Sequence, residues 1–152
     1  MTDPIATIGY ESATVPRVIE ALNEARVELL IDVRAVAASR RAGFSKTLLA
    51  ASLNQAGIGY LHLRGLGTPK EGRDLARAGK AEAMHAIFHE HMKTDTAHAA
   101  LEQAVAESRT RRVCLLCLEA DPHACHRSIV ADMMRAETGA EVVHLHPLPT
   151  FL

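Results

Sequence analysis

Side chains that can do chemistry are concentrated between Cys117 and Ser128, in the stretch CLEADPHACHRS. The stretch contains two cysteines, two histidines, a glutamate, an aspartate and an arginine, and it directly follows the apolar run from Val113 to Leu116. Carboxylates and imidazoles are the usual general acids and bases of enzymes, and thiols act as nucleophiles, redox groups or metal ligands. Four interpretations are therefore open: a catalytic pocket, a redox pair, a metal site, or a structural junction between a strand and a helix.

The two thiols of this stretch, on Cys117 and Cys125, could form a reversible disulfide across a turn from strand to helix. As a metal site, the pattern Cys117-x7-Cys125-His126 lacks the paired C-x2–4-C spacing of common zinc sites and offers only three soft ligands locally. We therefore predict no metal and no other cofactor. A thiol-based redox or metal-binding protein that uses Cys117 and Cys125 stays as an alternative.

A helix is predicted to start at Asp121 and Pro122, with the aspartate as N-cap and the proline in the first helical position. With a turn of about 100° per residue, His126 then faces the sheet and Arg127 turns outward. A buried imidazole needs a hydrogen-bond partner, and Glu119 in the preceding loop is the nearest candidate in the sequence.

Composition fits a single globular domain over residues 1–152, with 48% hydrophobic and 23% charged residues. The net charge of −1 excludes a globally basic nucleic-acid binder, although clusters such as Arg111-Arg112 leave a local basic patch open. No apolar run is long enough for a membrane span, and the N-terminus lacks the pattern of a signal peptide. We expect a cytoplasmic protein with reduced thiols and no membrane association; the sequence leaves the oligomeric state open.

Short β-branched or apolar runs alternate with helical patterns along the chain. We predict strands at 5–10, 28–33, 58–63, 111–118 and 141–146, and helices that include one opened by Ser45 and two at 80–92 and 95–108. This alternation predicts a single-domain α/β fold: a mostly parallel, Rossmann-like sheet of about five strands flanked by helices, with the strand at 111–118 in the centre. Residues 64–79 are expected to be a long loop, and loops of this length are often functional.

Polar residues collect where the predicted strands end. In open α/β sheets ligands bind at this edge, beside helix N-termini that favour anions. The residues that we expect there are Tyr10, Glu11, Asp32, Arg34, Ser39, Arg40, His62, Arg64, Cys117, Glu119, Cys125, His126 and Arg127.

Four basic residues of this edge could bind a phosphate-bearing ligand: Arg34, Arg40, Arg127 and Lys46, the last at a helix start. Planar guanidinium groups match phosphate oxygens. The alternative is that Arg34 pairs with Asp32 and that the other side chains are solvated. The glycine patterns of the phosphate loop and of the dinucleotide fold are both absent from the sequence.

Several ordered motifs resemble the bacterial and archaeal domain of unknown function family 488. They are TIGYE near the N-terminus, DVR at 32–34, SR at 39–40, GFSK at 43–46, GIGYLHLRGLG at 57–67 and LLCLEADPHACHR at 115–127. The chain departs from the family pattern at Ser12, where a glycine is usual, and at Ala37, where a proline is usual. The resemblance implies a small cytoplasmic α/β protein and brings no established reaction with it.

The sequence points first to an enzyme that acts on a phosphate-bearing small molecule, and we expect this to be a nucleotide, nucleoside or nucleic-acid base. Hydrolysis or transfer at an N-glycosidic bond suits a carboxylate beside a phosphate-binding arginine. Glu119 would be nucleophile or base, and His126 would orient it. Tyr10, Asp32 and Glu11 would complete the catalytic group, and Ser39 would help to bind the ligand. A non-catalytic nucleotide or nucleic-acid binding module is the second hypothesis.

Overall fold

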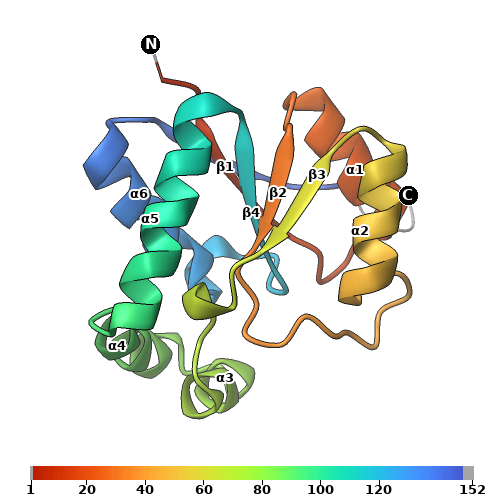
Figure 1. Cartoon of the computed structure of the whole chain (residues 1–152). Helices are drawn as coiled ribbons and strands as arrows, with labels where there is room; N and C mark the ends of the chain where they lie inside the picture. Colours follow the sequence, from red (N-terminus) through yellow and green to blue (C-terminus); the bar gives the residue numbers. More distant parts are fainter. Residues whose placement is uncertain (1, 149–152) are drawn as a thin grey trace.

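The chain forms an all-parallel, five-stranded sheet in the computed structural model, which describes residues 2–148 (Figure 1). The strand order is β3-β2-β4-β1-β5, so β4 is central as predicted. The strands are β1 (Ile5–Gly9), β2 (Leu29–Asp32), β3 (Gly59–His62), β4 (Val113–Cys117) and β5 (Val142–Leu145). Each lies within the range expected from the sequence, which confirms the α/β fold class.

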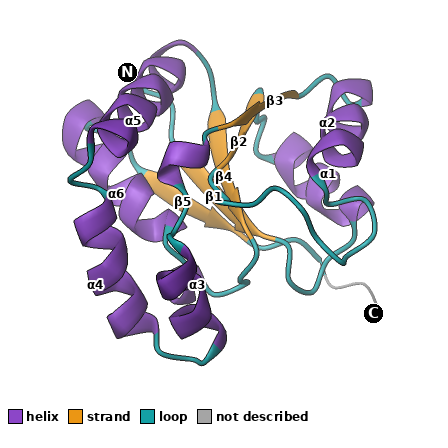
Figure 2. Ribbon diagram, turned by 60° about the horizontal axis from the view of Figure 1, so that its bottom comes forward, coloured by secondary structure: helices purple, strands orange, loops and turns teal. Residues whose placement is uncertain are grey.

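Helices cover both faces of the sheet. The helices are α1 (Val15–Glu24), α2 (Lys46–Gln55), α3 (Lys70–Arg77), α4 (Ala81–His91), α5 (Asp95–Thr110) and α6 (Arg127–Thr138), with short 3-10 turns η1 (Arg64–Leu66) and η2 (Pro122–Ala124). In Figure 1, α1 and α2 lie on one side of the sheet and α5 and α6 on the other. Figure 2 shows α3 and α4 beyond one end of the sheet. Within the described chain, every helix is too short or too polar to cross a membrane.

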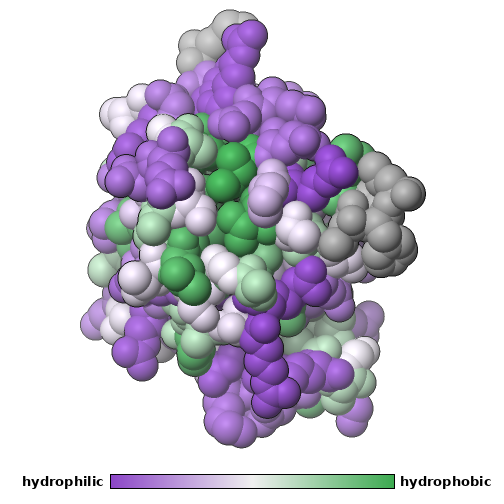
Figure 3. Space-filling view, turned by 90° about the vertical axis from the view of Figure 1, so that its right-hand side faces the viewer, coloured by the Kyte–Doolittle hydropathy of each residue, from purple (hydrophilic) through white to green (hydrophobic). Residues whose placement is uncertain are grey.

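The central strand packs against both helical layers because it is buried on both faces. Val113, Leu115 and Cys117 of β4 belong to the core that includes α4, α5 and α6. Cys114 and Leu116 point the other way, into the core beneath α1 and α2. Because successive side chains of β4 point to opposite faces of the sheet and both faces are covered, every residue at 113–117 must be apolar. Cys114 is fully buried, as expected for a small core residue. The outer surface on the α1 and α2 side mixes hydrophilic and hydrophobic residues (Figure 3).

The segment at 64–79 is not the loop that the sequence predicts, because Lys70–Arg77 is helical. In this helix, KEGRDLAR, Leu75 and Ala76 pack half-buried against the core, and Gly72 is the one fully buried residue. A Cβ at Gly72 would come within 2.4 Å of the Thr68 methyl group, so the helix packs closely on the segment before it. A contact face made of one glycine and two partly buried apolar residues is too short to be recognised from hydrophobic periodicity.

The helix predicted at Asp121 also begins later than expected. Asp121 does cap a helical turn, since its Oδ1 accepts the His123 amide at 2.9 Å, but that turn is the short η2. Cys125 is then extended, and α6 begins only at Arg127. The interruption changes the direction of the following side chains. The prediction that Arg127 turns outward is wrong: its side chain is fully buried.

The connection that leaves β4 crosses closely over the end of β1. Gly9 pairs with Cys117 in the sheet register. A Cβ at Gly9 would lie 1.8 Å from the carbonyl oxygen of Glu119, a distance at which backbone must move. The absence of a side chain at Gly9 is therefore a condition for the path of the β4–α6 connection.

We predict that Gly9→Ala lowers the free energy of unfolding by about 3 kcal/mol or more, because a methyl group there overpacks against backbone. Gly79→Ala is the matched control. Gly79 has φ +77° and open space around its missing Cβ, so only the backbone strain of about 1–2 kcal/mol is expected there. Urea denaturation of both variants measures the difference. Equal stabilities of the two variants would contradict the close approach.

Candidate functional site

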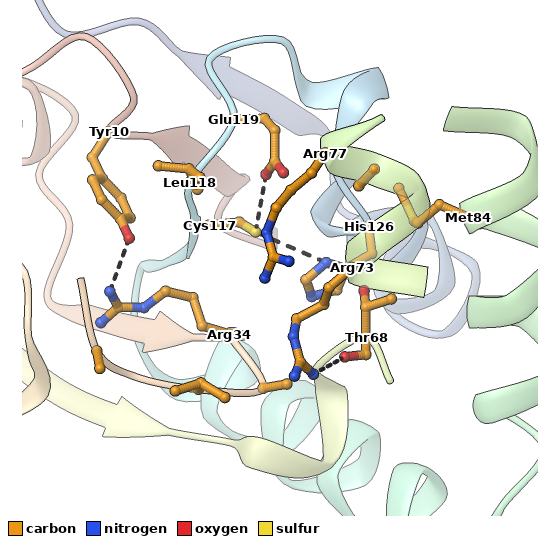
Figure 4. Close-up of a pocket in the computed structure, with 14 residues that line it drawn as sticks. Tyr10, Arg34, Thr68, Arg73, Arg77, Met84, Cys117, Leu118, Glu119 and His126 are labelled. Carbon is orange, nitrogen blue, oxygen red and sulfur yellow. Dashed lines mark hydrogen bonds between the residues drawn. The ribbon is translucent and has the colours of Figure 1, made fainter. Parts of the chain in front are cut away.

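A cavity of about 290 Å³ lies at the carboxyl edge of the sheet (Figure 4). Its walls come from the ends of β1, β2 and β4, from the segment before α3, and from α3 and α4. Its polar lining consists of Tyr10, Arg34, Thr68, Arg73, Arg77, Cys117, Glu119 and His126. The structure thus brings together five of the residues predicted from the sequence: Tyr10, Arg34, Cys117, Glu119 and His126.

Arg34 forms part of the cavity wall but is held in a buried pair with Asp32. Its Nε lies 2.9 Å from Asp32 Oδ1 and its Nη2 lies 2.7 Å from Oδ2. Its Nη1 donates to the Tyr10 hydroxyl at 3.0 Å and to the Phe44 carbonyl at 2.8 Å. Tyr60 donates its hydroxyl to Asp32 Oδ2 at 2.6 Å. The alternative pairing of Arg34 with Asp32 is the one that the structure contains.

The charges of this pair support each other. Burial opposes the charge of Arg34, but the hydrogen bond and the charge of Asp32 raise the pKa of Arg34 above its usual range. Burial and the Asp32 carboxylate also raise the pKa of Tyr60, which therefore stays protonated as a donor. Asp32 is fully buried and is not part of the cavity lining, and its link to the site is its pairing with Arg34.

Arg127 fixes the loop that follows β4. Its Nη1 and Nη2 donate to the carbonyls of Glu119 and Ala120, and its Nε donates to the Thr7 hydroxyl at 3.2 Å. Glu11 holds the same loop from outside, since its carboxylate accepts the Ala120 amide at 3.1 Å. In this arrangement both residues position the loop, and neither belongs to the cavity lining.

The remaining predicted ligand-binding residues also lie outside the cavity. Arg40 is exposed and lines a separate surface hollow. Lys46 is exposed at the start of α2, where its amide donates to the Ala37 carbonyl. Ser39 hydrogen bonds with Ser45 and so shapes the preceding loop. The structure does not gather the four predicted basic residues into one clamp.

The most unusual group in the cavity is a cluster of two thiols, an imidazole and a carboxylate. The Nδ1 of His126 lies 3.7 Å from Cys125 Sγ and 3.8 Å from Cys117 Sγ. The Sγ of Cys117 lies 3.5 Å from Oε2 of Glu119 (Figure 4). The other ring nitrogen, Nε2, is 2.8 Å from the Val33 carbonyl. The prediction that His126 forms its hydrogen bond with Glu119 is therefore wrong. The imidazole donates to the backbone carbonyl of Val33 instead, although Glu119 lies nearby.

Burial and mutual charge shift the pKa values in this cluster. Burial, together with a thiolate at Cys125, raises the pKa of Glu119 to about 7. Burial also works against a charged Cys125, but the hydrogen bond from Cys117 and the charge of His126 lower its pKa well below the usual value. The hydrogen bond with Cys125 and burial raise the pKa of Cys117. The pKa of His126 is raised because the Cys125 thiolate outweighs burial.

Three polar residues of the cavity lining were not predicted from the sequence: Thr68, Arg73 and Arg77. All lie in or beside α3, within the segment expected to be a loop. Arg73 is half-buried and donates to the Thr68 carbonyl at 2.9 Å, and Arg77 is exposed and pairs with Asp74. The Thr68 hydroxyl is buried and has no hydrogen-bond partner within the described residues. The concentration of cations in KEGRDLAR was the signal in the sequence that could have identified this wall.

We predict that Asp32→Ala lowers the free energy of unfolding by about 3–5 kcal/mol, because it leaves the buried guanidinium of Arg34 without its counter-charge. The double variant Asp32→Ala with Arg34→Met should regain part of this loss, because no unpaired charge remains. Urea denaturation of the two single variants and the double variant forms a double-mutant cycle. Additive losses would contradict strong coupling of the pair.

Comparisons with known proteins give one match. A family model described as Domain of unknown function DUF488 covers residues 14–134, which is most of the chain. No curated protein and no solved structure matches the sequence. The matched residues include the β4–α6 connection that carries Cys117, Glu119 and His126. The chain belongs to the domain of unknown function family DUF488.

Proposed function

We propose that the protein is an enzyme that acts on a small phosphate-bearing molecule, a nucleotide or nucleoside derivative, by hydrolysis or transfer at an N-glycosidic bond. The observation that carries this proposal is that Arg73, Arg77 and Glu119 line one cavity (Figure 4). Cationic donors and a carboxylate are the two groups that such a reaction requires.

The anion-binding part of the cavity is the wall formed by α3. The contact of Arg73 with the Thr68 carbonyl occupies one of the five N–H donors of its guanidinium group. Guanidinium groups bind phosphate oxygens through paired donors, which a lysine cannot reproduce. Arg73 and Arg77 therefore replace Arg40 and Lys46 as the phosphate binders that the sequence suggested.

The size of the cavity favours a small ligand. At about 290 Å³ it is close to the lower limit of about 300 Å³ for small-molecule pockets. A non-catalytic module for nucleic acid would need an extended basic groove, and the net charge of the chain is −1. A nucleoside monophosphate has the dimensions and the charge that suit the observed lining.

Two residues can carry the chemistry. The Glu119 carboxylate would act as nucleophile or as the base that activates water. The Tyr10 hydroxyl accepts a hydrogen bond from Arg34, so its own proton is free to be donated toward the leaving base. In hydrolysis, the N-glycosidic C–N bond breaks and the oxygen of water forms the new C–O bond. Glu119 takes one proton of this water and Tyr10 gives its proton to the departing base, after which the proton on Glu119 returns through solvent to Tyr10. His126 and Asp32 would be positioning residues.

We predict that the protein releases free base from a nucleoside monophosphate in a panel measured by chromatography. Glu119→Gln should lower kcat by about 10²–10⁴-fold, the usual loss when an acid or base group is removed. Arg73→Ala should mainly raise KM for phosphorylated substrates and should have little effect on unphosphorylated nucleosides. Arg17→Ala is the matched control, because Arg17 lies on α1 and pairs there with Glu20.

Unchanged turnover in Glu119→Gln would contradict the assignment. Salt-sensitive binding without turnover across the panel would instead support the binding-module alternative.

A further inference from the structure

We infer that Cys117, Cys125 and His126 form a binding site for a divalent metal ion of the zinc type, whose fourth coordination position lies at the cavity wall. The inference does not depend on the identity of the organic ligand. It rests on the geometry, burial and orientation of the three side chains.

The distances in the cluster match those between ligands of a tetrahedral metal. Zinc bonds of about 2.3 Å to sulfur and 2.0–2.1 Å to nitrogen place sulfur and nitrogen ligands about 3.6 Å apart. The Nδ1 of His126 lies 3.7 Å from one thiol and 3.8 Å from the other. All three ligand atoms lie within 4.8 Å of one another. Both sulfur-to-nitrogen distances are therefore already within a few tenths of an ångström of those in a tetrahedral zinc site.

The imidazole of His126 is held as metal-binding imidazoles usually are. Its Nε2 donates to the Val33 carbonyl at 2.8 Å, which directs Nδ1 at the two sulfur atoms. The ring also packs against Phe88, with centroids 4.9 Å apart. The contact with Val33, directly after β2, and the contact with Phe88 of α4 fix the ring from two directions, so its nitrogen is already presented to the two sulfur atoms.

The donor types select a soft or borderline metal. Two thiols and one imidazole suit zinc and disfavour the oxygen-seeking ions magnesium and calcium. All three side chains are buried, and they come from the end of β4, from the extended residue Cys125 and from the start of α6. The common C-x2–4-C pattern is absent because the ligands lie on both sides of a loop rather than in one knuckle.

The fourth position distinguishes this cluster from a closed structural site. Cys117, His126 and Glu119 all line the cavity, and Glu119 Oε2 is 3.5 Å from Cys117 Sγ. This carboxylate can fill the fourth position or stand beside a water molecule bound there. Three protein ligands with one position open to a cavity are the arrangement found at catalytic zinc sites.

The test is metal titration of the untagged, chelator-treated protein under reducing conditions. We expect one equivalent of Zn²⁺ to bind and to raise the unfolding midpoint. One equivalent of Co²⁺ should give the intense absorption of thiolate-to-cobalt charge transfer. Cys125→Ser should weaken Zn²⁺ binding by more than the roughly 10–100-fold that follows loss of a ligand's hydrogen-bond partner. Cys114→Ala is the matched control. Cys114 is buried in β4, the strand that also carries Cys117, but its side chain belongs to the core on the opposite face of the sheet.

Absence of the thiolate absorption in the wild-type protein would overturn the inference, and this measurement does not depend on the folding of any variant. A disulfide between Cys117 and Cys125 in air, found by mass spectrometry together with no bound Zn²⁺, would overturn it in favour of a redox pair. The base-release assay separates this outcome from the proposed function. If the wild-type protein bound no Zn²⁺ but still released free base in a reaction that depends on Glu119, the metal site alone would be refuted.

Discussion

The buried guanidinium of Arg127 is the contact on which the cavity depends. An unpaired charge in the interior is costly, so Arg127 must keep its partners in the carbonyls of Glu119 and Ala120 and in the Thr7 hydroxyl. These bonds tie the connection after β4 to the middle of β1. The missing side chain at Gly9 makes room for the same connection. Together these two features determine where Glu119 stands.

A second buried ion pair, Asp32 with Arg34, forms the opposite wall of the cavity. Arg34 also donates to the Tyr10 hydroxyl, and Asp32 accepts a hydrogen bond from Tyr60. The adjacent Val33 carbonyl accepts a hydrogen bond from the His126 imidazole. The reactive groups therefore stand between two fixed frames, one built on Arg127 and the other on Arg34. Arg34 and Arg127, which the sequence suggests as ligand-binding residues, instead hold neighbouring backbone and side chains in place. Besides Arg34, the cations that line the cavity are Arg73 and Arg77 of α3.

Much of the fold followed from local patterns, and the errors have identifiable causes. The strands were predictable because apolar runs such as 113–117 are bounded by polar residues and turns. Helix α3 was missed because its packing face is limited to Gly72, Leu75 and Ala76, which is too short a hydrophobic pattern to detect. The predicted direction of Arg127 was wrong because the helix was expected to begin at Asp121, whereas the backbone is extended at Cys125 and the helix begins after it.

The convergence of Tyr10, Cys117, Glu119 and His126 was predictable from the shared edge of a parallel sheet. The closure of Arg34 on Asp32 was one of two open alternatives, since sequence spacing does not show whether a charge is already paired.

The most direct test of the central claim is a crystal structure of the protein soaked with a panel of phosphate and nucleoside monophosphates. We expect electron density in the cavity at the ends of β1, β2 and β4, with a phosphate group against Arg73 and the sugar or base near Glu119. Density confined to the surface hollow at Arg40, or a cavity that stays empty of every compound in the panel, would contradict the claim that this cavity binds a phosphate-bearing substrate.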